Sequence, residues 1–202
     1  LGEDWAQPRE SVREGGLSTW AVVEDAGRFF NWNNLSASNR SSRSSRDILL
    51  DLMTFCGDLS PVVRVEALAD YVDVDEEGAY EADFYRKADP PSAPPDRELW
   101  APAELLRVHE FSEDLFRSRP RVDPDDLFGG DLAASTALVP RPLEAPLPVN
   151  VNTASRDVLM GVIGLEQEAA VRAILSLRQV QPFESLAMMF MANPEVAAAL
   201  EG

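Results

Sequence analysis

The sequence has few of the side chains on which most catalytic and metal sites depend. Its 202 residues include one cysteine, Cys56, and one histidine, His109. A single cysteine excludes an internal disulfide and leaves the redox compartment open. Pairs of Cys or His at ligand spacing are missing, and so is a glycine loop that could hold a phosphate. These absences argue against an enzyme, and we interpret His109 as an ordinary side chain at a helix end.

Long apolar runs are missing as well. No stretch approaches the roughly 18 consecutive apolar residues that a membrane-spanning helix needs. No basic-then-apolar signal peptide opens the chain. The first residue is Leu1 and not Met. We therefore expect a fragment or a processed product whose natural N-terminus lay upstream.

Basic side chains are scarce, because 18 Lys and Arg stand against 35 Asp and Glu, for a formal net charge of -17. Most of the excess acidity falls in residues 66–131. Phosphate backbones and anionic lipid head groups are bound through cationic side chains, so such a surface repels both. The composition predicts cations or basic protein surfaces as partners, and no nucleic acid.

Two short aromatic and β-branched runs stand on either side of an acidic turn near the N-terminus. The runs are residues 17–23 and 29–32, and Glu24-Asp25-Ala26-Gly27 separates them. This pattern is typical of a β-hairpin. An isolated hairpin has no third layer to cover its rings. We therefore expect a partner-binding surface on the hairpin, and the alternative is that all four of its large rings belong to the core: Trp20, Phe29, Phe30 and Trp32.

Helical patterns follow the hairpin. Residues 46–55 repeat apolar side chains at helical spacing after a possible cap, Ser45. A second helix is predicted from Pro61 to about Val72, because proline suits the first turn of a helix. Further short helices are predicted over 102–108, 112–117, 157–163, 166–177, 185–190 and 194–200.

The fold class predicted from these elements is α+β and predominantly α, with a small N-terminal β-hairpin and a helical domain that contains a helix-hairpin-helix motif. In that motif Thr153 caps the first helix and Gly164 ends it. The predicted divisions are a flexible lead-in (1–16), the hairpin and its connector (17–46), a helical domain with an acidic loop (47–128), a Pro/Gly linker (129–149) and a helix-hairpin-helix lobe (150–202).

Four blocks, in this order along the chain, resemble the K-type minor pseudopilins of type II secretion. They are the Asp-Ala-Gly and Asn-Xaa-Asn block at 24–35, the Leu-Ala-Asp-Tyr-Val-Asp block at 68–75, the blocks within 81–105, and the Val-Asn-Thr-Ala to Pro-Phe-Glu-Ser-Leu block at 149–186. The resemblance implies that the hairpin is the remnant of a pseudopilin scaffold. It also implies a non-enzymatic subunit in protein export, located at the periplasmic face of the inner membrane. An N-terminal anchoring helix absent from this sequence would hold it there, and it would assemble with I-type and J-type pseudopilins at the pseudopilus tip.

The acidic loop has the side chains of a calcium site. Carboxylates alternate along Asp73, Asp75 and Glu77 before Gly78, and calcium takes six to eight oxygen ligands. Phe84 stands where an EF-hand loop requires Glu, so the loop is not an EF-hand. The resemblance implies calcium in this helical domain, and the alternative is a solvated acidic turn. The candidate ligands are Asp70, Asp73, Asp75, Glu77, Glu81 and Asp83.

A DNA-binding protein of the competence type is the alternative function, since such proteins share the helix-hairpin-helix motif. Backbone amides at 163–165 could approach a phosphate. From residue 150 onward, however, six acidic side chains stand against three arginines. A surface of this sign opposes binding to a phosphate backbone.

Overall fold

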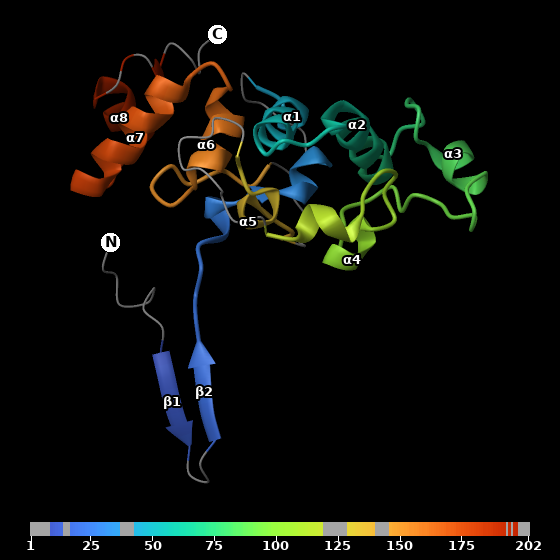
Figure 1. Ribbon diagram of the computed structural model, residues 1–202, viewed down its shortest axis with the longest axis horizontal. Helices are drawn as coiled ribbons and strands as arrows, with labels where there is room; N and C mark the ends of the chain where they lie inside the picture. Colours follow the sequence, from blue (N-terminus) through green and yellow to red (C-terminus); the bar gives the residue numbers. More distant parts are fainter. Residues whose placement is uncertain are drawn as a thin grey trace.

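Two helices, α1 (Ser45–Phe55) and α2 (Pro61–Val72), form the centre of the computed structural model (Figure 1). The structure describes residues 9–13, 17–36, 43–118, 129–139, 146–192, 194, 196 and 197. Helix α1 begins one residue earlier than predicted, because Ser44 and not Ser45 is its N-cap. The Ser44 hydroxyl accepts from the Asp47 N–H and the Asp47 carboxylate accepts from the Ser44 N–H, which completes a capping box. Helix α2 begins at Pro61 as predicted.

The C-terminal part contains α6 (Arg156–Ile163), α7 (Glu168–Val180) and α8 (Leu186–Ala192). Helix α6 packs on α1, and a Cβ on Gly161 would lie only 2.9 Å from the Leu52 Cβ. The small residue therefore sets the close approach of the two helices. The predicted helix 194–200 lies largely outside the described residues, although residues 194, 196 and 197 are helical.

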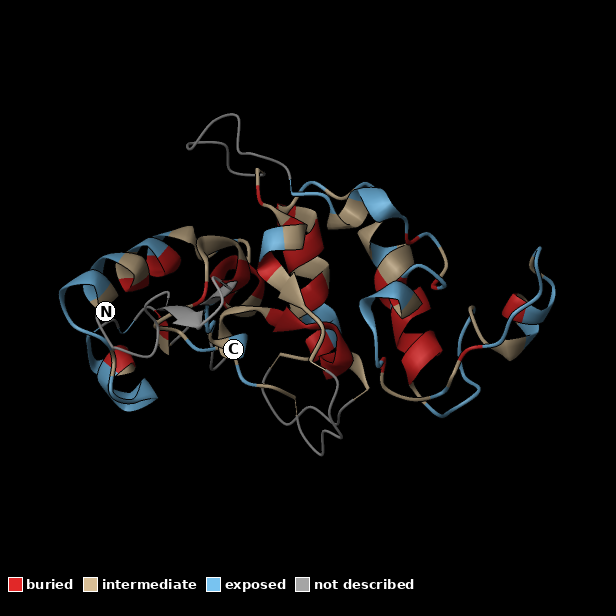
Figure 2. Ribbon diagram, turned by 90° about the horizontal axis from the view of Figure 1, so that it is seen from below, coloured by how far each residue is buried: buried red, intermediate tan, exposed pale blue. Residues whose placement is uncertain are grey.

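Helix α1 contributes to both apolar clusters of the core. Leu49 and Leu52 are fully buried in a cluster with α2, and Phe55 is buried with the apolar faces of α6 and α7. Buried residues gather on the facing sides of these central helices (Figure 2). Among the described residues, none of the helices has both the length and the apolar character of a membrane-spanning segment.

The predicted hairpin around residues 24–27 is wrong. The antiparallel hairpin joins β1 (Arg9–Arg13) to β2 (Leu17–Ala21), so β1 lies inside the predicted lead-in. The acidic turn instead forms a 3-10 helix, η2 (Ala26–Arg28), and the Gly27 N–H in it donates to the Asp25 carboxylate. The second aromatic run continues into the core, where burial of its large rings is worth more than pairing with β2.

A second small sheet joins distant segments. Strand β3 (Phe30–Asn31) pairs in parallel with β4 (Thr136–Ala137). Strand β4 follows α5 (Leu132–Ser135), and both lie within the predicted linker 129–149. Leu132 and Ser135 are buried, so this part of the predicted linker packs into the body. Four short helices complete the described elements: η3 (Trp32–Leu35), α3 (Ala82–Arg86), α4 (Pro102–Leu105) and η4 (Glu113–Phe116).

Candidate functional site

The acidic loop between α2 and α3 brings three carboxylates together. One oxygen from each of Asp73, Asp75 and Glu81 lies within 4.8 Å of the others. Asp73 caps the C-terminus of α2 through its N–H, which donates to the Ala69 carbonyl. Because the chain turns immediately after α2 and returns at α3, residues eight positions apart face one space.

Gly78 and Asp70 fix the path of this loop. Asp70 is buried at the end of α2, and its Oδ2 accepts from the Tyr80 N–H at 3.0 Å. A Cβ on Gly78 would lie 2.2 Å from the same Oδ2. Only glycine allows the loop to pass this close to the Asp70 carboxylate.

Burial and like charge raise the pKa values of two of the three carboxyls. Burial is the largest cause at Asp73 and raises its pKa to about 6, the negative charge of Asp75 adds to this, and Arg46 opposes it. Burial also raises the pKa of Glu81, and the next cause is the charge of Asp70. Carboxylates held this way resist ionisation unless a cation neutralises them.

Two oxygens of the cluster also lack donors. Asp73 Oδ1 and Glu81 Oε1 are buried and have no hydrogen-bond partner among the described residues. A buried carboxylate oxygen without a donor is costly, and a hard cation is the partner that oxygen ligands of this kind take. Asp73, Asp75 and Glu81 are therefore the described residues that could hold a hard cation such as calcium.

The other predicted ligands have different roles in the structure. Asp70 supports the loop through the Tyr80 N–H, and Asp83 pairs with Arg86 on the surface of α3. Glu77 is exposed, and its N–H donates to the Asp75 carboxylate. Sequence reasoning missed Asp96, whose charge helps to raise the pKa values of both Asp73 and Glu81. It follows a proline-rich loop, and no local pattern indicated that this loop returns to the cluster.

The aromatic residues predicted to bind a partner divide into two groups. Phe30 and Trp32 are 1% and 2% exposed, so the prediction of a partner-binding surface is wrong for them. Trp32 meets Phe111 edge to face at a ring distance of 5.7 Å. A ring of this size gains more from burial in the core than from a two-stranded ribbon. Phe29 is half-buried beneath the Arg28 guanidinium, and the Trp20 side chain lies outside the described residues.

The segment after the acidic turn holds the fold together through asparagine side chains. Asn31 Oδ1 accepts from the Val139 N–H at 3.0 Å. Asn34 bonds to both the N–H and the carbonyl of Leu147. An amide side chain has the same donor and acceptor groups as a peptide unit, so it can pair with a backbone segment as a neighbouring strand would.

The end of α6 in the α6–α7 hairpin is held by one arginine, Arg43, that binds its carbonyl groups. Gly164 ends α6 with φ +117°, as the sequence predicted for this position. Arg43 donates to the carbonyls of Gly161 and Val162 at the end of α6. Ser155, and not Thr153, is the N-cap of α6. The structure places two helices and a glycine turn where the helix-hairpin-helix was predicted, and the motif itself stays a prediction.

No family model matches the chain, and no curated protein matches it in sequence. A solved structure does match, the GspK chain of the GspK-GspI-GspJ complex from the type 2 secretion system of enterotoxigenic Escherichia coli. The TM-score is 0.68 over 96% of this chain, at 20% sequence identity. The chain has a GspK-like fold. It spans 65% of the length of that GspK chain.

Proposed function

We propose that the chain is the exported region of a K-type minor pseudopilin, a non-enzymatic subunit at the tip of the type II secretion pseudopilus. The observation that carries this proposal is the GspK-like fold over 96% of the chain. The proposal includes a location at the periplasmic face of the inner membrane and an anchoring helix N-terminal to this sequence. The GspK neighbour was solved with GspI and GspJ, which supports I-type and J-type pseudopilins as partners.

The hairpin β1–β2 and the two valines that follow it form the proposed assembly surface. Among the described elements these strands pair only with each other, and the hairpin stands away from the helices (Figure 1). Unpaired strand edges are ready to add a strand from a neighbour, and a two-stranded hairpin alone is marginally stable. Val22 and Val23 are 64% and 55% exposed beside it. A neighbouring pseudopilin would form hydrogen bonds with the unpaired strand edge and cover the apolar side chains.

Substitution of one exposed valine tests this surface. Val22→Asp is expected to weaken co-purification with an I-type and a J-type pseudopilin, because it places a charge in an apolar contact. Val180→Asp is the matched control, since Val180 is 88% exposed at the end of α7. Equal recovery of both variants in the complex would remove residues 22–23 from the interface.

The role in export is tested in the source organism. Deletion of the gene is expected to leave type II cargo in the periplasm, and the full-length gene is expected to restore export. Unchanged export after deletion contradicts the proposal.

We further propose that Asp73, Asp75 and Glu81 hold a calcium ion that stabilises the loop between α2 and α3. The support is the 4.8 Å grouping of their oxygens together with the two buried oxygens that lack donors. When bound, calcium would supply structural cross-linking of the loop and no reaction chemistry.

A further inference from the structure

The root of the hairpin β1–β2 is bound to the C-terminal lobe by a small group of hydrogen bonds. Strand β2 ends at Ala21, and residues 22–25 continue to η2 without regular secondary structure. At the end of this stretch Asp25 Oδ2 accepts from Asn150 Nδ2 at 2.8 Å and from the Thr153 hydroxyl at 2.6 Å. Hydrogen bonds to a charged carboxylate are among the stronger ones in proteins. They join segments that are 125 and 128 positions apart in the sequence.

Backbone groups close the same contact. The Asn150 N–H donates to the Gly27 carbonyl at 2.7 Å, and the Gly27 N–H donates to Asp25 Oδ1 at 2.9 Å. A Cβ on Gly27 would lie 3.3 Å from the Asn150 Cβ, so the two segments are in close contact. We call these four residues the clasp: Asp25, Gly27, Asn150 and Thr153.

On the lobe side the clasp is part of the turn that leads into α6. The Asn150 carbonyl accepts from the Thr153 N–H at 3.1 Å and from the Ala154 N–H at 2.9 Å. Asn150 Oδ1 accepts from the Asn152 N–H at 3.0 Å. The donors and acceptors of Asn150 are therefore all in use, and they hold Asp25 against the start of a helix.

On the other side of the clasp lies a short exposed link. Val22 and Val23 are 64% and 55% exposed, and Glu24 is exposed as well. Among the described elements β1 and β2 pair only with each other, and the hairpin stands away from the helices (Figure 1). A link with few buried side chains resists changes in its backbone angles weakly, and hinge motions concentrate in such segments.

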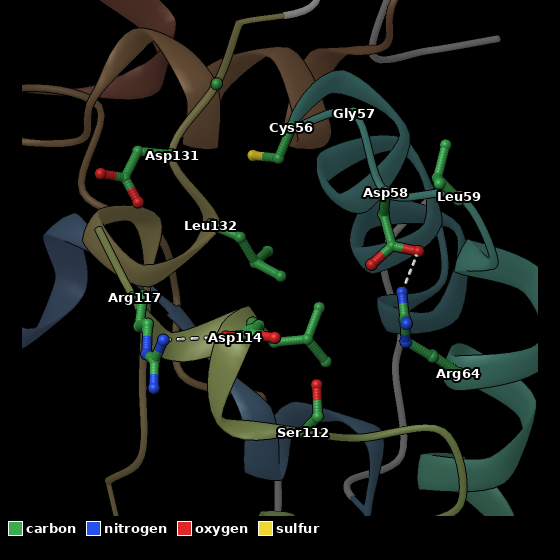
Figure 3. Close-up of a pocket in the computed structure, with 12 residues that line it drawn as sticks. Cys56, Gly57, Asp58, Leu59, Arg64, Ser112, Asp114, Arg117, Asp131 and Leu132 are labelled. Carbon is green, nitrogen blue, oxygen red and sulfur yellow. Dashed lines mark hydrogen bonds and ion pairs between the residues drawn. The ribbon is translucent and has the colours of Figure 1, made fainter. Parts of the chain in front are cut away.

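The helical body beyond the clasp is held by contacts of its own. Helix α6 packs closely on α1 at Gly161. The loop that follows α1 is tied through Arg64, which bonds to the Asp58 carboxylate and donates from Nε to the Glu110 carbonyl at 2.9 Å. Figure 3 shows the Asp58–Arg64 pair at the edge of the pocket between this loop and η4. The link 22–24 is therefore the segment in which the direction of the hairpin can change.

We propose that the clasp sets the direction in which the hairpin points from the helical body, and that opening the clasp lets the hairpin turn about residues 22–24. With the Asp25 bonds in place, the free link is three residues long. Without them it extends toward Phe30, the next residue that is fully buried. The direction of the hairpin depends on these bonds whether or not the hairpin meets a pseudopilin.

Double electron–electron resonance between two spin labels measures this direction. Cys56→Ser removes the one native thiol, and the labels are attached at Thr19→Cys in β2 and at Gln179→Cys, an exposed position of α7. This labelled protein is expected to give one narrow distance distribution. Asp25→Ala is expected to widen the distribution roughly twofold or more, because the link lengthens.

Two further variants separate the clasp from other effects of a substitution. Glu24→Gln removes an exposed charge that pairs with Arg28 and leaves the clasp intact, so the width should not change. Thr153→Val removes one of the two side-chain donors to Asp25 with little change in shape, and it should widen the distribution less than Asp25→Ala does. Thr153→Val decides if Asp25→Ala fails to fold. A distribution that is already broad in the labelled parent, or that no clasp variant widens beyond Glu24→Gln, overturns the proposal.

Hydrogen exchange shows whether the clasp has opened. The Asn150 N–H, which donates to the Gly27 carbonyl, is expected to exchange roughly tenfold faster in Asp25→Ala. Faster exchange together with an unchanged distance distribution would contradict a role of the clasp in directing the hairpin. Unchanged exchange would show that Asp25 does not hold the clasp closed.

Discussion

Asn33 bonds to both backbone groups of Leu99, 66 positions away in the sequence. Its Nδ2 donates to the Leu99 carbonyl at 2.9 Å, and its Oδ1 accepts from the Leu99 N–H at 2.8 Å. Both residues are fully buried. The Asn33 amide therefore makes the two hydrogen bonds that a neighbouring strand would make with Leu99, and it joins η3 (Trp32–Leu35) to the segment before α4.

Asn33→Ala should leave the N–H and the carbonyl of Leu99 buried without partners. Each unsatisfied group costs about 1–3 kcal/mol, so the loss of both is expected to lower the free energy of unfolding by about 2–6 kcal/mol. Urea titration measures this. Gln181→Ala removes an exposed amide and should change stability by less than about 0.5 kcal/mol. If Asn33→Ala lowers the free energy of unfolding as little as Gln181→Ala does, the bonds between Asn33 and Leu99 do not stabilise the fold.

Calcium is expected to raise the melting temperature of the parent chain, because a ligand that binds only the folded state stabilises it by mass action. Asp73→Asn combined with Asp75→Asn should abolish the shift between millimolar calcium and a chelator. Glu76→Gln is the matched control, since it removes one exposed charge from the same loop and should retain the shift. Identical melting with calcium and with chelator in the parent chain would rule out the site.

Asp25 links the N-terminal segment to the start of the C-terminal lobe and should make stability depend on acid pH. The Thr153 hydroxyl donates to Asp25 Oδ2 at 2.6 Å, and this bond is the main cause that lowers the Asp25 pKa below 3.8. A lowered pKa in the folded state stabilises the protein above the unfolded pKa, and the stabilisation disappears as pH falls through the folded value.

The comparison of the parent chain with Asp25→Asn measures this contribution. The parent should melt at a higher temperature at pH 7 and at pH 5, and the difference should shrink as the pH falls below 3.8. A difference that stays constant, or grows, down to about pH 3 would show that the Asp25 charge is not involved.

Duplex DNA is expected not to bind the purified chain at physiological salt, because the net charge of -17 opposes the phosphate backbone. Arg43, the basic side chain beside the α6–α7 turn, already donates to carbonyl groups of α6. Electrophoretic retardation that saturates and weakens with added salt would instead favour the DNA-binding alternative.

Local patterns predicted the helices better than the long-range contacts. Pro61 and Gly164 have the positions that the sequence assigned to them, because helix starts and ends depend on neighbouring residues. The pairing of β3 with β4 depends on residues more than a hundred positions apart, and nothing near Phe30 indicates it. Trp32 is buried in the core, and an aromatic residue in a short apolar run is equally compatible with a strand of a hairpin, so the sequence could not distinguish the two.

Only part of the acidic site was predicted, because local patterns show residues that are close in sequence and not those that the fold brings together. Spacing along the loop indicated Asp73 and Asp75, which are close in sequence. The backbone path around Gly78 brings Glu81 to Asp73 and Asp75, whereas Asp83 pairs with Arg86. Spacing along the sequence does not show this path.

A K-type tip pseudopilin should assemble with its I-type and J-type neighbours, and the mass of the resulting complex measures whether this chain does so. The purified chain is mixed with the soluble regions of an I-type and a J-type pseudopilin from the same organism, and light scattering coupled to size exclusion gives the mass. We expect one peak whose mass equals the sum of the three chains. Three separate peaks at the individual masses, at concentrations well above micromolar, would contradict it.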